Sequence, residues 1–299
     1  MKPWLIFFLT LKIATAEYVP VVLWHGMGDT CCFSFSLGGF QRFLEEQLKG
    51  VYVHSLRIGN STTEDFENGY FMNPNHQIEY ACNQIAGDPY LKKGFNAIGF
   101  SQGAQFMRGL IQRCGHLLPP VKNFISLGGQ HQGVYGLPHC GAVSHATCDY
   151  FRKLLNYAAY VGWVQKYLVQ ATYWHDPLNE ALYKNNSIFL SDINNEKRVL
   201  KGYVRNLQKL EHFVMVKFDN DTMVQPVETS WFGFYAPGQS IKLQNLQESN
   251  IYKKDRLGLK QMDKDGKLVF LHTEGDHLRF TDGWFIKNIL QPYLNMTIE

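Results

Sequence analysis

A short segment with glycine on both sides of a serine, Gly99-Phe100-Ser101-Gln102-Gly103, constrains the fold of this chain most strongly. An apolar run, residues 97–100, leads into it, and apolar residues at helical spacing follow it at positions 104, 107, 110 and 111. A strand that turns sharply at a serine and continues as a helix is a nucleophile elbow, which holds the hydroxyl at the carboxyl end of the strand. Glycine at 99 and 103 lets strand and helix approach closely, because it has no Cβ. The alternative is a glycine-flanked serine in an ordinary loop.

A second motif follows the first predicted strand. Residues 19–24 form a continuous apolar run of the kind buried in a parallel sheet, and they lead into His25-Gly26-Met27-Gly28-Asp29. In such a sheet the backbone N–H of Met27 would join that of Gln102 as an oxyanion hole, which stabilises negative charge on a reacting carbonyl oxygen. A glycine turn without a catalytic role is the alternative. We expect His25 to be structural, since the general base of this arrangement comes late in the chain.

The loop after a late predicted strand, residues 213–218, offers two carboxylates as the acid partner of a serine nucleophile. Asp219 adjoins the end of the strand and could simply be solvated there. Asp221 lies further into the loop, where it can reach over the edge of the sheet. We therefore favour Asp221, with Asp219 as the competitor.

The last predicted strand, residues 268–271, is followed by a loop that contains Gly275-Asp276-His277. His277 has the position of the general base, whereas His272, on or beside the strand, is expected to be packed. The order Ser101, Asp221, His277 is that of the α/β-hydrolase fold and differs from the chymotrypsin and subtilisin orders.

Strands and helices alternate through residue 114, as in a doubly wound, mostly parallel sheet. Helices are predicted at residues 40–48, at 76–85 and from about 284, and strands at 51–58, from about 95, and at 121–127. Residues 59–74 form a polar stretch to which we assign no element.

The segment from 137 to about 210 contains no convincing buried strand apart from residues 188–190. It carries aromatic residues in a helical pattern, namely Phe151, Tyr157, Tyr160, Trp163 and Tyr167. Aromatic stripes usually pack into a core, but between two strands of a hydrolase sheet this segment is expected to form an inserted helical lid. We thus predict one α/β-hydrolase domain at 17–299, with the lid at about 137–210.

Residues 1–16 have the pattern of a cleaved secretory signal peptide: Lys2, then an apolar stretch, then Ala14-Thr15-Ala16. No later segment supplies about 20 continuous apolar residues, so no membrane span is expected. The chain has 29 Lys and Arg against 26 Asp and Glu. Without a basic stripe, nucleic acid is not an expected partner. The hydrophobic share of 45% is ample for a substantial core.

Six cysteines in a chain expected to be secreted predict disulfides, because paired C-x-x-C zinc spacing is absent. The spacing leaves their pairing open. They are Cys31, Cys32, Cys82, Cys114, Cys140 and Cys148. Four N-x-S/T sequons are candidate glycosylation sites, each of which could be unused. Their asparagines are Asn60, Asn185, Asn220 and Asn295.

Long blocks of the sequence resemble the lysosomal palmitoyl-protein thioesterases, α/β-hydrolases that remove long acyl chains from cysteine. The resemblance covers nearly all of residues 17–299 and includes residues 24–29, 99–103, 128–133, 185–187, 231–235 and 274–277. It implies that Ser101 is the nucleophile, Asp221 the acid and His277 the base, with oxyanion donors at Met27 and Gln102.

The resemblance also implies the disulfides Cys31–Cys32, Cys82–Cys114 and Cys140–Cys148, and an acyl groove beneath the lid. Relatives commonly have a second aspartate at the position of Gln225, so this chain lacks one rival for the acid role. At Asp219 an apolar residue would be expected.

We predict a serine thioesterase that hydrolyses long-chain fatty acyl thioesters during lysosomal degradation, with no metal or organic cofactor. The expected substrates are S-palmitoylated proteins or peptides and acyl-CoA, and the expected location is lysosomal or secreted. A triad does not identify its leaving group, so a secreted oxygen-ester lipase is an alternative. A non-catalytic lipid carrier with the same fold is a second alternative, which the intact triad disfavours.

Overall fold

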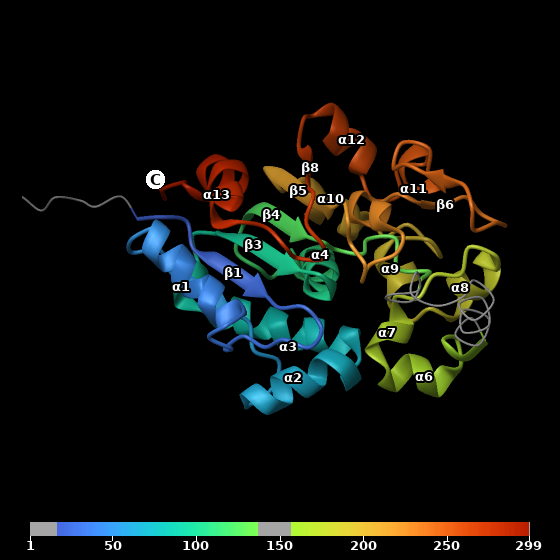
Figure 1. Cartoon of the computed structure of the whole chain (residues 1–299), viewed down its shortest axis with the longest axis horizontal. Helices are drawn as coiled ribbons and strands as arrows, with labels where there is room; N and C mark the ends of the chain where they lie inside the picture. The colour runs from blue at the N-terminus through green and yellow to red at the C-terminus, as the bar shows by residue number, and fades with distance from the viewer. Residues whose placement is uncertain (1–16, 137–156, 299) are drawn as a thin grey trace, which may run out of the picture.

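A computed structural model describes residues 17–136 and 157–298 of the chain. Its centre is a parallel sheet in the order β2-β1-β3-β4-β5-β8 (Figure 1). The strands are β1 (Val21–Trp24), β2 (Val53–Ser55), β3 (Phe95–Phe100), β4 (Val121–Leu127), β5 (His212–Phe218) and β8 (Leu268–Thr273). This sheet confirms the predicted α/β fold class.

Alternate strand residues enter opposite faces of the sheet, and both faces are buried. In β5, Phe213 and Met215 belong to one apolar cluster, whereas Val214 and Val216 belong to the other. Burial on both faces explains why the strands appear in the sequence as continuous apolar runs.

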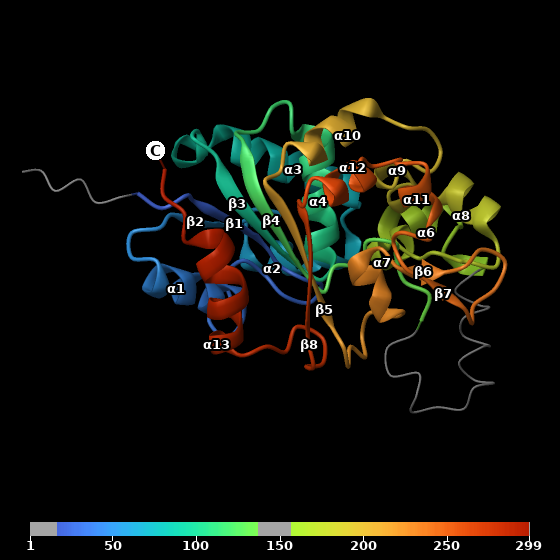
Figure 2. The same ribbon diagram turned by 90° about the horizontal axis from the view of Figure 1, so that it is seen from above.

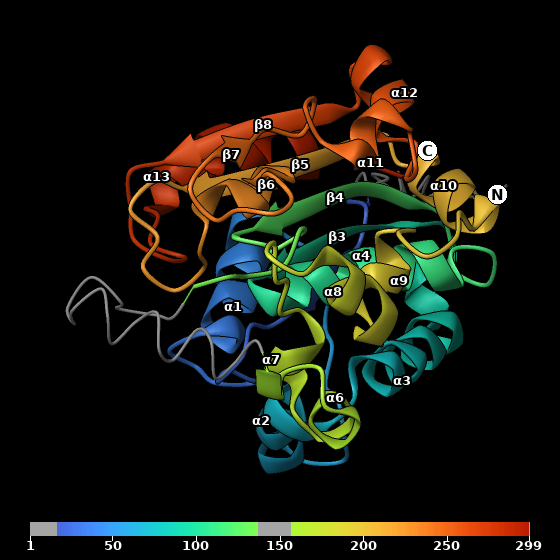
Figure 3. The same ribbon diagram turned by 90° about the vertical axis from the view of Figure 1, so that its right-hand side faces the viewer.

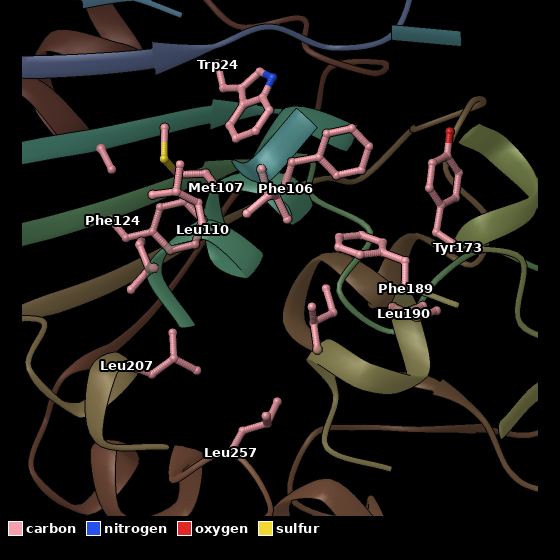
Figure 4. Packing of buried hydrophobic residues seen from close by; sticks show 14 of the residues in the cluster. Trp24, Phe106, Met107, Leu110, Phe124, Tyr173, Phe189, Leu190, Leu207 and Leu257 are labelled. Atoms are coloured by element: carbon pink, nitrogen blue, oxygen red, sulfur yellow. The ribbon is translucent and has the colours of Figure 1, made fainter. Parts of the chain in front are cut away.

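Helices cover the two faces as separate layers (Figure 2). One layer contains α3 (Pro74–Gly87), α4 (Gln102–Cys114) and α10 (Lys201–Gln208), and the other contains α1 (Leu37–Gln47), α13 (Asp282–Phe285) and the π-helical segment η4 (Ile286–Leu294). Phe106 of α4 packs edge-on against Trp24, with ring centroids 5.7 Å apart, and against Phe189 at 5.5 Å (Figure 4).

The polar stretch 59–74 contains a helix that was not expected, α2 (Thr62–Phe71). Ser61 caps it, because its side chain accepts a hydrogen bond from the backbone N–H of Glu64 at 3.1 Å. Serine followed three residues later by glutamate is a capping pattern, and this was the available signal. The weak amphipathicity of the segment concealed the helix.

Between β4 and β5 the described residues 157–210 form short helices and no strand. These are α6 (Gly162–Tyr167), α7 (Val169–Thr172), α8 (Glu180–Asn186), α9 (Leu190–Ile193) and α10. The strand expected at 188–190 is wrong, since Phe189 and Leu190 lead into α9. Both side chains are fully buried among helices, so their apolar character reflects helix packing and not a sheet.

A second inserted segment lies between β5 and β8 in the chain. It contains η3 (Val227–Trp231), the antiparallel pair β6 (Phe234–Tyr235) and β7 (Leu243–Gln244), α11 (Asn250–Lys253) and α12 (Leu259–Lys264). A short 3-10 helix, η1 (Pro89–Leu91), precedes β3. Figure 3 shows α7 beside α2, below the row of strands. In the described ranges, no helix combines the length and apolar character needed to cross a bilayer.

Candidate active site

The turn at Ser101 has the geometry of a nucleophile elbow. Ser101 joins β3 to α4 with φ of 54° and ψ of −123°, a conformation that costs strain energy for a residue with a side chain. A Cβ at Gly99 would lie 2.3 Å from Cα of Ala104, and one at Gly103 would lie 2.2 Å from the carbonyl oxygen of His25. Both distances are far shorter than contact, so the turn requires glycine at these positions.

The structure brings Ser101, His277 and Asp221 into one hydrogen-bonded row. Nε2 of His277 lies 2.9 Å from Oγ of Ser101, and Nδ1 lies 2.6 Å from Oδ2 of Asp221. The other oxygen of Asp221 accepts the backbone N–H groups of Met223 and Val224, each at 2.8 Å. Asp221 is only 4% exposed, and its oxygens act as acceptors in these bonds. Nδ1 of His277 therefore carries the hydrogen, which leaves the Nε2 lone pair facing the serine hydroxyl.

The competitor Asp219 has other partners. It pairs with Lys217 at 3.0 Å and with His272 at 2.6 Å. Partial burial would raise the pKa of Asp219, but hydrogen bonds from His272 and Lys217 outweigh this and lower it. The expectation that His272 is packed is wrong, since its side chain is 61% exposed. β8 is an edge strand, so a side chain near its end is open to solvent.

The two predicted oxyanion donors lie on either side of Ser101. A Cβ at Gly26 would lie 3.2 Å from Cβ of Ser101, so the loop that carries Met27 passes directly beside the serine. Gln102 is the first residue of α4. Within the described chain, the backbone N–H groups of Met27 and Gln102 have no hydrogen-bond partner. Free N–H groups at this position are suited to hold an anionic oxygen.

A further carboxylate joins the loops that carry the acid and the base. Asp276 accepts the backbone N–H of His277 at 2.7 Å, and the backbone N–H and hydroxyl of Thr222 at 2.8 and 3.0 Å. These bonds to the ionised form lower the pKa of Asp276. No sequence pattern distinguishes Asp276 from other surface carboxylates, so its contacts were not anticipated.

Ser101 and His277 open into a cavity of about 590 Å³. Most of its walls are apolar side chains, which come from the loop after β1, the segment 158–174 and the loops after β4, β5 and β8. Lining residues include Met27, Leu37, Val164, Leu168, Trp174 and Phe280.

The structure contains the disulfides Cys31–Cys32 and Cys82–Cys114. Cys140 and Cys148 lie outside the described residues, as does the predicted signal peptide. All four sequon asparagines, Asn60, Asn185, Asn220 and Asn295, are exposed. In the part of the chain that the structure describes, no three His, Cys, Asp or Glu side chains are grouped to hold a metal ion.

Comparison with known proteins identifies the family. The family model described as palmitoyl protein thioesterase matches residues 20–277. The chain is 48% identical to palmitoyl-protein thioesterase 1 of Caenorhabditis elegans, over 95% of this chain and 96% of the relative. It is 35% identical to palmitoyl-protein thioesterase 3 of Dictyostelium discoideum, over 91% and 90%, and 27% identical to lysosomal thioesterase PPT2 of Homo sapiens, over 85% and 80%. The chain therefore belongs to the palmitoyl protein thioesterase family.

Proposed function

We propose that this protein is a serine thioesterase that hydrolyses long-chain acyl thioesters, such as palmitate bound to cysteine. The observation that carries the proposal is the hydrogen-bonded row Ser101–His277–Asp221 at the wall of a mainly apolar cavity of about 590 Å³. Family membership supports a thioester as the bond that is cleaved.

In the first half of the reaction, Nε2 of His277 accepts the proton of the Ser101 hydroxyl as Oγ attacks the thioester carbonyl carbon. The negative charge that forms on the carbonyl oxygen is held by the N–H groups of Met27 and Gln102. The C–S bond then breaks, and the thiol leaves with the proton from His277. Asp221 keeps the imidazole in the required tautomer and stabilises the imidazolium.

In the second half, His277 removes a proton from water, which attacks the acyl-enzyme carbonyl carbon. The fatty acid leaves and the Ser101 hydroxyl is restored. The acyl chain is expected to occupy the cavity, where each buried CH₂ contributes about 0.8 kcal/mol. The helices α6 and α7 supply part of the cavity wall, in keeping with a lid over the site.

The proposal includes the processing of the chain. Residues 1–16 are removed as a signal peptide, Cys140 and Cys148 form the third disulfide, and some of the four sequons carry glycans. The protein then resides in the lysosome or is secreted, and it acts on lipidated proteins or peptides and on acyl-CoA. The name of the human relative, lysosomal thioesterase PPT2, supports the lysosomal location.

Two measurements test the proposal. A fluorophosphonate probe is expected to label the wild-type protein and not the Ser101→Ala variant, which separates an enzyme from a lipid carrier. The ratio of kcat/KM for matched palmitoyl thioester and oxygen-ester substrates is expected to favour the thioester. A protein that is not labelled, or that hydrolyses thioesters equally well without Ser101, would refute the mechanism; a clear preference for the oxygen ester would favour the lipase alternative.

The acyl cavity is tested with thioesters from acetyl to stearoyl, each kept below its aggregation limit. We expect kcat/KM to rise several-fold for every two added carbons and to level off near palmitoyl, when the cavity is filled. A flat profile beyond butyryl would contradict a long-chain site and leave the assignment of Ser101 intact.

A further inference from the structure

Both ends of the loop that carries Met27 contact one buried carboxylate, that of Asp65. Asp65, in α2, is fully buried. Its Oδ1 accepts the backbone N–H of Ile58 at 2.6 Å and lies 3.0 Å from Nε2 of His25, and its Oδ2 accepts the backbone N–H of Cys31 at 2.8 Å. His25 and Cys31 are the two ends of the loop, so α2 fixes both ends through a single side chain.

The contacts of His25 define its protonation. The side chain is only 2% exposed, and its Nδ1 lies 2.8 Å from the carbonyl oxygen of Gly26, which can only accept a hydrogen bond. Nδ1 therefore carries a hydrogen. At Nε2 the partner is Asp65, whose two oxygens also accept backbone N–H groups; these bonds lower the pKa of Asp65 and favour the ionised carboxylate, which only accepts. Both ring nitrogens donate, and the ring is an imidazolium.

The surroundings favour this charged pair. Burial by itself would lower the pKa of His25, but the hydrogen bond and charge of Asp65, the Gly26 carbonyl and the charge of Asp29 outweigh it and raise the pKa. Burial would likewise raise the pKa of Asp65, but bonds from His25, Cys31 and Ile58 lower it. From α4, the neighbour is the neutral side chain of Gln102, which donates to Gly69 of α2 at 2.9 Å.

We infer that His25 acts as a protonated positioning residue, whose ion pair with Asp65 fixes the loop that presents the Met27 N–H to the oxyanion. This rests on the proposed function, in which Met27 is an oxyanion donor. Loss of a proton from His25 leaves one ring nitrogen facing an acceptor, which repels it and releases one end of the loop. Activity then falls at alkaline pH.

The deciding variant is Asp65→Asn, which removes the counter-charge of His25 and keeps the size of the side chain. An adjacent opposite charge shifts a pKa by about 1–3 units, so we expect the alkaline limb of the kcat/KM profile to move to lower pH by about one unit or more. The acidic limb should stay in place, because Asp65 contacts His25, Cys31 and Ile58 and no member of the row Ser101–His277–Asp221. The maximal kcat is expected to fall by up to ~10²–10³, the cost of losing one oxyanion donor.

The matched control is Asp88→Asn. Asp88 is also paired with a histidine, since it lies 2.7 Å from Nδ1 of His54, but neither residue lines the cavity of Ser101. In Asp88→Asn the pH dependence of kcat/KM, on both its acidic and its alkaline side, and the maximal kcat/KM should equal those of the wild-type protein. A uniform loss of kcat in Asp65→Asn with both limbs unmoved would overturn the inference, because a merely structural contact lowers activity without a pH shift.

A measurement on the wild-type protein covers the case in which Asp65→Asn does not fold. In ¹⁵N-histidine-labelled protein, with His25 assigned by comparison with His25→Gln, both ring nitrogens of His25 should show protonated chemical shifts at pH 7. One protonated and one bare nitrogen would overturn the inference. Failure of the proposed function is recognised separately, as activity that survives in Ser101→Ala.

Discussion

The pairs His277–Asp221 and His25–Asp65 have the same chemical groups but different second partners. The histidine lies 2.6 Å from the carboxylate in the first pair and 3.0 Å in the second. The second ring nitrogen of His277, Nε2, lies 2.9 Å from the Ser101 hydroxyl oxygen. The second ring nitrogen of His25, Nδ1, lies 2.8 Å from the Gly26 carbonyl oxygen. A hydroxyl can give up a proton and a carbonyl cannot. The partner at the second nitrogen therefore suits His277 to accept a proton and holds His25 as a hydrogen-bond donor.

A third buried histidine extends the comparison. Nδ1 of His131 accepts from Nε of Arg108 at 3.2 Å, and Nε2 lies 2.8 Å from Oγ of Ser126. Since a guanidinium only donates, Nδ1 carries no hydrogen and the ring is neutral. Burial, and then the charge of Arg108, lower the pKa of His131 well below its usual value. The ring nitrogens of the three histidines thus donate or accept differently because their neighbours differ.

The largest expected effect is the difference in kcat between a variant of His277, the proposed base, and a variant of His25, the proposed positioning residue. His277→Ala removes the group that activates Ser101 and should lower kcat by ~10⁶, whereas His25→Gln should cost only ~10²–10³ through the oxyanion hole. Single-turnover hydrolysis of a palmitoyl thioester measures both losses, and circular dichroism checks the fold. Losses of kcat of equal size would contradict the conclusion that the two histidines have different roles.

The next effect distinguishes the two candidate acids. Asp221→Asn keeps the shape of the side chain but favours the wrong tautomer of His277, and it should lower kcat by ~10⁴. Asp219→Asn is the control, because Asp219 contacts Lys217 and His272 and lies outside the row. Steady-state kcat values of the two variants provide the test. A larger loss in Asp219→Asn would show that the acid is wrongly assigned.

A smaller effect concerns the link between the acid and base loops. Thr222→Val removes the hydroxyl that donates to Asp276 at 3.0 Å and keeps the backbone bond at 2.8 Å. We expect kcat to fall ~10-fold with KM unchanged, since a slight misplacement of His277 affects the reacting geometry and not substrate binding. Thr222→Ser restores the hydroxyl and should restore kcat. No difference between valine and serine at 222 would show that the hydroxyl has no positioning role.

The smallest effect concerns stability at acid pH. The unfolded chain protonates His131 below about pH 6.5, whereas the folded protein keeps it neutral, so the unfolded state binds more protons. The free energy of unfolding should therefore fall as the pH drops below about 6.5, by up to ~1.4 kcal/mol per pH unit from this group. Urea unfolding at pH 7.5 and 5.5 measures the slope. In His131→Asn the slope should be shallower by this amount, and an unchanged slope would contradict a neutral His131.

Local patterns in the sequence were sufficient for the strands of the parallel sheet and for the hydrogen-bonded row Ser101–His277–Asp221. Residues 121–127 appeared as a strand because burial on both sheet faces demands a continuous apolar run, and the structure has β4 at these residues. Ser101, Asp221 and His277 were identifiable because a parallel sheet collects the ends of its strands at one edge, so chain order alone predicts their proximity. The resemblance to known thioesterases added the substrate class, which the family comparison supports.

Other features depended on contacts between distant segments, which no local pattern encodes. Helix α2 lies in a stretch that appears polar, and its buried side chain is Asp65, whose partners are His25, Cys31 and Ile58 in segments before the helix. The run 188–190 resembles a strand, yet it packs among helices, since burial favours the same apolar residues in either element. Likewise, His25, His131 and His277 are the same residue in the sequence. Only the tertiary structure decided which of them donates, accepts or exchanges a proton, because that depends on the groups 2.5–3.5 Å from each ring nitrogen.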